Sequence, residues 1–270
     1  TSLPAWMHWR QWIAVIGLLV LSLSVMHGNA FELSPTSRAT APSSFSLEEW
    51  VIRNVAAKTF SGLFDFAPGQ GHSDEERKSA LDRYFMLGNR MGRIEGSMAL
   101  SLARGGVGGK DNLEVVALEQ RLDDLRQERD DLGTMVEQRL EKVVATVLRQ
   151  NGLDRNWGPL KPLFPPVSFR LDRLPKLIVV SPRERIATLE VHLLKPELSI
   201  EDRDSLEVAV RRDQDRSALV VGLGGLATFP SLVSDSQSLR FSLQTIVHEW
   251  LHHYFFFHVL GQAYYDSANM

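Results

Sequence analysis

The hydrophobic pattern predicts two long helices in the first half of the chain. Residues 73–103 open with a capping box of Ser73 and Glu76 and then repeat hydrophobic side chains at helical spacing. Residues 113–150 carry a near-heptad repeat that Arg129 interrupts. The repeating positions are Leu81, Tyr84, Leu87, Met91, Ile94 and Met98, then Leu118, Leu122, Leu125, Leu132, Val136, Val143 and Val147. Because only a glycine-rich segment joins them, the two helices are expected to form an antiparallel hairpin over residues 73–152.

Three glycines stand at four-residue intervals on the first of these helices: Gly88, Gly92 and Gly96. Glycine lowers helix propensity, so the pattern predicts that the second helix approaches closely along this stripe. The hairpin is expected to serve as a packing scaffold or spacer. The alternative is a surface for docking or self-association.

A different pattern, of short strands, follows the loop of residues 151–166, which holds Gly158 and four prolines. The expected elements are strands at residues 177–180, 186–194 and 218–223, and helices at residues 199–212 and 239–257. The last helix has one hydrophobic side, made of Leu243, Ile246, Val247, Trp250, Leu251 and Tyr254. Strands combined with amphipathic helices predict an α+β fold, with a catalytic domain over residues 153–270.

The amino-terminal residues 1–30 are expected to direct the chain to a membrane. Ile13–Met26 is an uncharged hydrophobic run, and Arg10 and three tryptophans precede it. A single-pass anchor is favoured, and a signal peptide cleaved near Gly28-Asn29-Ala30 is the alternative. With Arg10 on the amino side, the remainder is expected outside the cytoplasm. Residues 31–72 are expected to form a flexible tether and then a short helix that Ser46 and Glu49 cap.

Composition narrows the class of function. The chain has 270 residues, of which 44% are hydrophobic, enough for a buried core. Its formal charge of −3 provides no basic field, so no nucleic-acid partner is expected. The absence of cysteine excludes disulfides and thiolate ligands, so a metal ion would be bound by histidine and carboxylate side chains.

The sequence His248-Glu249-Trp250-Leu251-His252 lies within the last expected helix and has the HExxH pattern. Residues four apart on a helix lie on the same side, one turn apart, so the imidazoles of His248 and His252 can bind one ion. Neutral imidazoles are zinc ligands, and zinc lowers the pKa of a bound water. Glu249 is then the candidate general base that removes the proton of that water. The alternative is a purely structural role, in which this is an aromatic core helix whose histidines only form hydrogen bonds.

Through this motif and residues 176–258, under half of the chain, the sequence resembles the zincin metallopeptidases. The resemblance implies a zinc-dependent peptidase in which a small sheet packs on the motif helix. It also implies that an edge strand binds an extended substrate, for which Ala218–Val233 is the candidate. The alternative for that stretch is an ordinary buried strand and turn.

Two patterns within the zincin family, metzincin and gluzincin, suggest different residues as the third zinc ligand. His258 has the position of the third histidine in the metzincin pattern, but Phe255 replaces that pattern's glycine. On a continuous helix His258 would lie about 240° around from His252, so the gluzincin pattern, with a later Glu as third ligand, is favoured. No Glu follows Glu249, so the expectation is a gluzincin-like chain that stops before its third ligand. His253 is expected to point away from the metal, and Tyr264 and Tyr265 to pack.

The expected function is that of a membrane-anchored zinc metallopeptidase acting on peptides or proteins, with Zn²⁺ as cofactor. The rival interpretation is an inactive, membrane-bound coiled-coil interaction protein with a zincin-like domain. Zinc-dependent hydrolysis of a non-peptide bond is a third class that uses the same helix.

Overall fold

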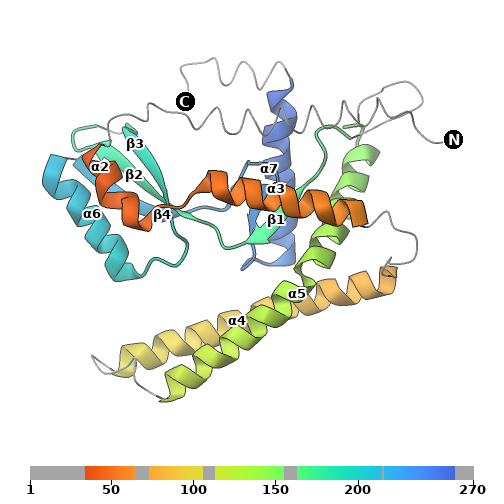
Figure 1. The fold of residues 1–270 in the computed structure, drawn as a ribbon, viewed down its shortest axis with the longest axis horizontal. Coiled ribbons are helices and arrows are strands. Elements are labelled where there is room, and N and C mark those ends of the chain that lie inside the picture. The colour runs from red at the N-terminus through yellow and green to blue at the C-terminus, as the bar shows by residue number, and fades with distance from the viewer. Residues whose placement is uncertain are drawn as a thin grey trace. The chain divides into compact units, whose positions relative to one another are not determined.

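The computed structural model describes residues 34–64, 73–105, 113–154, 163–185, 187–214 and 216–258. In these residues the fold is α+β, as expected, with six α-helices, one 3₁₀-helix and six short strands in two small sheets (Figure 1). The described chain divides into two compact units. The first holds residues 34–61 and 173–232, and the second holds residues 62–172 and 233–258.

A three-stranded antiparallel sheet forms the centre of the first unit. Its strand order is β3 (Glu190–Leu194), β2 (Lys176–Pro182), β4 (Arg216–Gly222). The register places Val180 of β2 between Glu190 and Ala218. Ile178 and Val180 are buried on one face of this sheet together with Val210 of α6 (Ile200–Gln214). All the strands and helices expected from residues 176 to 214 are therefore present, with β3 shorter than expected.

The segment expected to be a flexible tether is folded from Ser34 onward. Ser34 caps helix α2 (Pro35–Thr40) by accepting a hydrogen bond from the Ser37 N–H, and the 3₁₀-helix η1 (Ala41–Ser43) follows. The Phe45 N–H then donates to the Leu193 carbonyl, and the Lys195 N–H donates to the Ser43 carbonyl. This segment thus covers the outer edge of β3, which would otherwise expose unpaired backbone groups. Helix α3 (Leu47–Phe64) continues from it.

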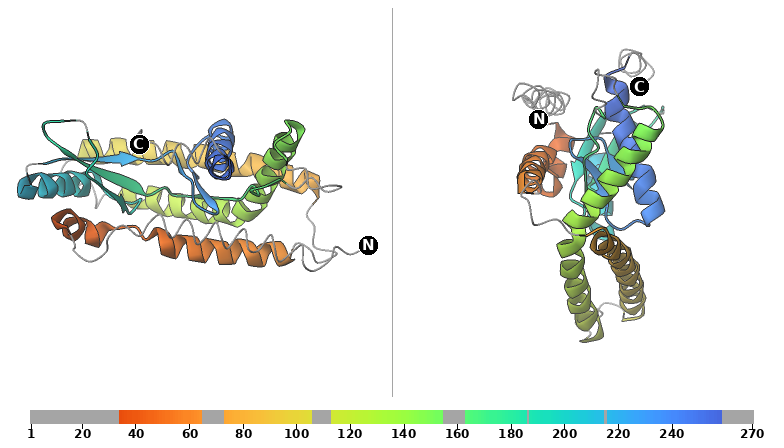
Figure 2. Two further views of the ribbon diagram at one scale, coloured as in Figure 1. Left: turned by 90° about the horizontal axis from the view of Figure 1, so that it is seen from above. Right: turned by 90° about the vertical axis from the view of Figure 1, so that its right-hand side faces the viewer.

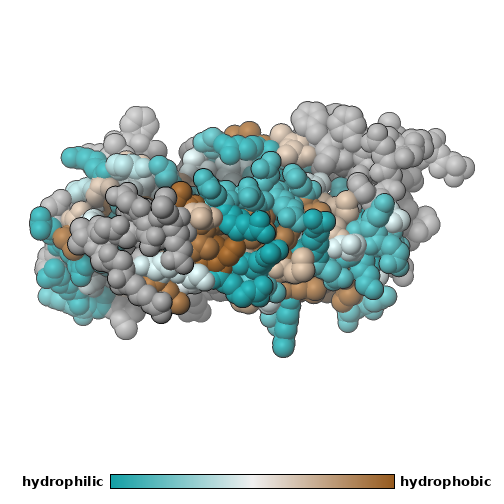
Figure 3. All heavy atoms as spheres, turned by 90° about the horizontal axis from the view of Figure 1, so that it is seen from below, coloured by the Kyte–Doolittle hydropathy of each residue, from teal (hydrophilic) through white to brown (hydrophobic). Residues whose placement is uncertain are grey.

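The expected helical hairpin is confirmed in the second unit. Helices α4 (Asp74–Gly105) and α5 (Leu113–Gln150) lie side by side, with Leu87 and Met91 packed against Leu122 and Leu125 (Figure 2). In Figure 3 the coloured part of the surface shows hydrophilic residues with hydrophobic areas between them. Exposed ion pairs such as Arg83 with Glu128 connect the two helices.

Two details of the expected hairpin are wrong. A Cβ atom placed on Gly88, Gly92 or Gly96 would meet nothing within 4 Å, so no neighbouring helix approaches closely along this stripe. Val143 and Val147 are also exposed, at 38% and 49%. The buried residues of this half of α5 are instead Val136, Leu140, Val144 and Leu148. The heptad pattern fails there because this half of α5 packs on β1 and α7 as well as on the first turns of α4.

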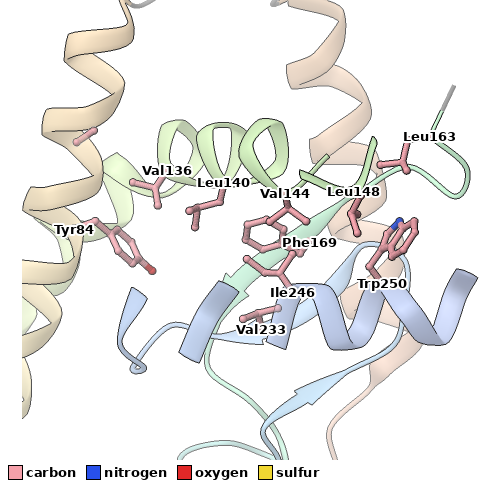
Figure 4. Packing of buried hydrophobic residues seen from close by; sticks show 11 residues of the cluster. Tyr84, Val136, Leu140, Val144, Leu148, Leu163, Phe169, Val233, Ile246 and Trp250 are labelled. Atoms are coloured by element: carbon pink, nitrogen blue, oxygen red, sulfur yellow. The ribbon is translucent and has the colours of Figure 1, made fainter. Parts of the chain in front are cut away.

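The core of the second unit is formed where α5 meets β1 (Phe169–Asp172) and α7 (Leu239–Phe256). Figure 4 shows Ile246 and Trp250 of α7 directed toward Val144, Leu148 and Phe169. The Trp250 indole N–H also donates to the Pro165 carbonyl at 2.8 Å. Of the expected hydrophobic side, Ile246 and Trp250 are buried and the other four residues are partly buried against the same core. The buried side of α7 also includes polar residues, namely Ser242, Thr245, Glu249 and His253.

The strands that pack near α7 are not the expected ones. The core around Ile246 contains Phe169 of β1 and Val233 of β6 (Ser231–Ser234). Strands β1 and β6 are hydrogen-bonded neighbours in the second small sheet. The strands expected to serve there, β2 to β4, form the sheet of the first unit. The candidate edge strand over residues 218–233 consists of three short strands, β4, β5 (Gly225–Leu226) and β6.

Carboxylates of α5 satisfy the backbone of β1. Glu141 accepts a hydrogen bond from the Phe169 N–H at 3.0 Å, and Glu137 accepts one from the Leu171 N–H at 2.9 Å. Glu137 is only 1% exposed and is also paired with Arg170. These contacts hold β1 in register against α5, because a shifted strand would leave buried polar groups unpaired.

The expected membrane segment, Ile13–Met26, lies outside the described residues. Within the described part of the chain, no helix has both the length and the hydrophobicity needed to cross a membrane.

Candidate metal centre

The histidines and the glutamate of the HExxH motif lie on different sides of helix α7 and differ in exposure. The first turn of the helix is capped by Ser238, whose hydroxyl accepts a hydrogen bond from the Phe241 N–H. His248 and His252 are exposed, whereas Glu249 between them is buried, with 5% of its surface exposed. The core contacts of Ile246 and Trp250 fix the rotation of the helix and therefore determine which side the histidines occupy.

The two histidine rings converge on one point. Their Nε2 atoms are 3.2 Å apart, and the ring planes meet at 80°. Two imidazole nitrogens on one tetrahedral zinc ion, at Zn–N distances of about 2.0–2.1 Å, are separated by about 3.3 Å. The nitrogen donors of His248 and His252 therefore fit a single zinc ion.

The electrostatics of these residues also suit a hydrolytic metal site. Burial raises the pKa of the Glu249 carboxyl, and the neighbouring charge of His248 opposes that rise. A raised pKa brings a carboxylate closer to the range in which it can both accept and return a proton. Partial burial, together with the charge of His248, lowers the pKa of His252 and favours the neutral ring that binds metal.

The described residues do not bring a third ligand to this pair. Between residues 34 and 258, with the gaps given above, no group of three His, Asp or Glu side chains is placed to hold a metal ion. His258 is stacked on Tyr254 with ring centroids 4.0 Å apart, and its Nδ1 lies 2.6 Å from the Tyr254 carbonyl oxygen. His253 is buried on the core side of α7. The two expected packing tyrosines, Tyr264 and Tyr265, lie outside the described residues.

Two exposed phenylalanines on the histidine side of α7 were not anticipated from the sequence. Phe241 and Phe255 are 38% and 40% exposed, and their helical positions place them on the same side of α7 as His248 and His252. Their spacing was the available signal, since residues seven apart, or three or four apart, share one side of a helix.

Comparison with known proteins identified no relatives. No family model, no curated protein and no solved structure matches the chain.

Proposed function

We propose that this chain is a zinc-dependent metallopeptidase that hydrolyses peptide bonds, with His248 and His252 as zinc ligands and Glu249 as general base. The observation that carries the proposal is the 3.2 Å separation of the two Nε2 atoms, one turn apart on a helix whose opposite side is buried. A raised pKa on the intervening carboxyl supports the same assignment.

The chain's own side chains account for binding and proton transfer in this reaction. When bound, zinc would polarise the substrate carbonyl and lower the pKa of a water molecule. Glu249 accepts the proton that the attacking water loses and delivers it to the leaving amine nitrogen as the C–N bond breaks. Because it follows His248 directly in the sequence, Glu249 would lie near a zinc ion held by the two histidines without serving as a ligand.

Hydrolysis of a peptide pool tests the proposal. The zinc-loaded chain is expected to cleave peptides, and Glu249→Gln is expected to reduce kcat about 10²- to 10⁴-fold while zinc remains bound. Glu201→Gln, an exposed change of the same type on α6, serves as the control and should leave cleavage unaltered. Zinc binding without cleavage of any peptide would favour the rival interpretation, an inactive interaction protein that uses the α4–α5 hairpin.

Membrane attachment is a separate part of the proposal. Ile13–Met26 anchors the chain, and Arg10 keeps the amino terminus on the cytoplasmic side, with the peptidase outside. Added protease should therefore digest residues beyond 31 on intact cells. Digestion that requires permeabilised cells would contradict this topology.

A further inference from the structure

One side of α7 combines the histidine pair with exposed aromatic rings. At about 100° per residue, Phe241, His252 and Phe255 lie within about 40° of His248 around the helix axis. All four side chains are exposed, and the phenylalanines expose 38% and 40% of their surface. Gln244, about 40° from His248, is also exposed, and the exposed Arg240 lies about 80° away. The residues within about 40° of His248 therefore include no charged carboxylate or ammonium group.

The two phenylalanines differ in distance from the ligand pair. Phe255 is three residues beyond His252, a rise of about 4.5 Å, whereas Phe241 is seven residues before His248, a rise of about 10 Å. The Phe255 ring meets Tyr254 edge-on, with centroids 5.7 Å apart, and 40% of its surface is exposed. Phe255 is thus the exposed phenylalanine whose position on the helix is nearer to the ligand pair.

Single exposed hydrophobic residues are common on protein surfaces, so exposure alone would not indicate a role. Here the exposed residue shares one side of α7 with the ligand pair, and its rise of about 4.5 Å from His252 is a distance that an extended peptide covers in about two residues. A phenyl ring offers no hydrogen bond, and covering it is favourable only for an apolar group.

We propose that Phe255 determines specificity by contacting a large apolar side chain of the substrate, within about two residues of the bond that is cleaved. This inference rests on the proposed peptidase function and names its substrate class: peptides with Leu, Phe or a similar side chain near the scissile bond. Phe241, equally exposed but farther from the pair, makes no such contact.

Peptide binding tests the role of Phe255 in specificity without requiring that the peptide be cleaved. The zinc-loaded Glu249→Gln chain is mixed with labelled peptides that have alanine at every position except a central Phe, Leu or Asn, and fluorescence anisotropy gives Kd. We expect the Phe and Leu peptides to bind about tenfold more tightly than the Asn peptide. Phe255→Ala should remove this preference, Phe255→Leu should keep most of it, and Phe241→Ala should leave it unchanged.

Several outcomes would overturn the assignment of Phe255. They are equal binding of the three peptides, no binding of any, a preference that survives Phe255→Ala, or an equal loss in Phe241→Ala. A failure of the proposed peptidase function can be distinguished from a failure of the Phe255 assignment. In that case the unsubstituted chain would cleave no peptide, while selective binding through Phe255 would still be measured. Unchanged melting temperatures of the two exposed-site variants would show that each is folded.

Discussion

Arg129 of α5 forms a buried ion pair with Asp235, which lies between β6 and α7. The Arg129 side chain is 6% exposed and that of Asp235 is 11% exposed. A second guanidinium nitrogen of Arg129 donates to the Asp235 carbonyl at 3.3 Å, and the guanidinium carbon lies 5.4 Å from the centroid of the Tyr84 ring. The pair therefore connects the hairpin to the segment from which the motif helix begins.

Removal of this arginine should strongly destabilise the second unit. Arg129→Ala leaves the Asp235 carboxylate buried without its partner, and such losses cost about 3–5 kcal/mol. Arg126→Ala, on the same helix, removes only exposed ion pairs with Glu95 and Asp123 and should cost about 1 kcal/mol or less. Urea unfolding of the two variants gives both free energies of unfolding, and equal values would contradict the structural role of the buried pair.

Arg129 also shows what the hydrophobic pattern could and could not predict. The hydrophobic pattern predicts the hairpin because α4 and the first half of α5 form an ordinary helix pair, in which hydrophobic residues recur on the side that the two helices share. A charged residue at a heptad position was visible as an interruption, but its partner is 106 residues away in sequence. No local pattern reveals such a contact, and none could show that the second half of α5 turns its buried side to β1 and α7.

The glycines of α4 should be replaceable with a gain in stability. Because a Cβ at Gly92 would meet nothing within 4 Å, Gly92→Ala introduces no clash and should stabilise by about 0.5–1 kcal/mol through helix propensity. Gly152 is the matched control, since it follows α5 with a φ of +74°. There an alanine would be strained, and Gly152→Ala should destabilise by about 1–2 kcal/mol. Thermal melts measure both changes. A loss of stability in Gly92→Ala would indicate that another helix does pack closely against Gly92.

Glu190 should make the first unit sensitive to acid. Burial alone would raise the pKa of Glu190, but hydrogen bonds from Ser34, His192 and Arg216 outweigh it and lower the pKa below the ordinary 4.5. A lowered folded-state pKa contributes stability above the unfolded-state value, and that contribution is lost as the pH falls through the folded-state pKa.

Stability measured from pH 7 down to pH 2 checks this contribution. The unsubstituted chain should lose stability below about pH 4.5, and Glu190→Gln should reduce that loss because it has no carboxyl to protonate at this position. Glu48→Gln, at an exposed position in the first turn of α3, is the control and should leave the profile unchanged. Identical profiles for the chain and Glu190→Gln would show that these hydrogen bonds do not favour the charged carboxyl.

The candidate site was predictable where it depends on one helix. Ligand spacing and the side occupied by His248 and His252 follow from helical geometry, and the hydrophobic residues around Ile246 and Trp250 identify the buried side. The burial of Glu249 and the identity of the strands behind α7 depend on packing between distant segments. Sequence periodicity carries no information on either, so only the structure supplies them.

Zinc affinity of the histidine variants shows whether α7 is the metal centre. Competition with a chelating dye measures zinc bound by the unsubstituted chain, by His252→Ala and by His258→Ala. We expect the unsubstituted chain to bind zinc through the two histidines, more weakly than a site with three ligands would, to lose that zinc in His252→Ala, and to retain it in His258→Ala because that ring is stacked on Tyr254. Zinc binding that persists in His252→Ala would contradict the assignment of the metal centre to α7.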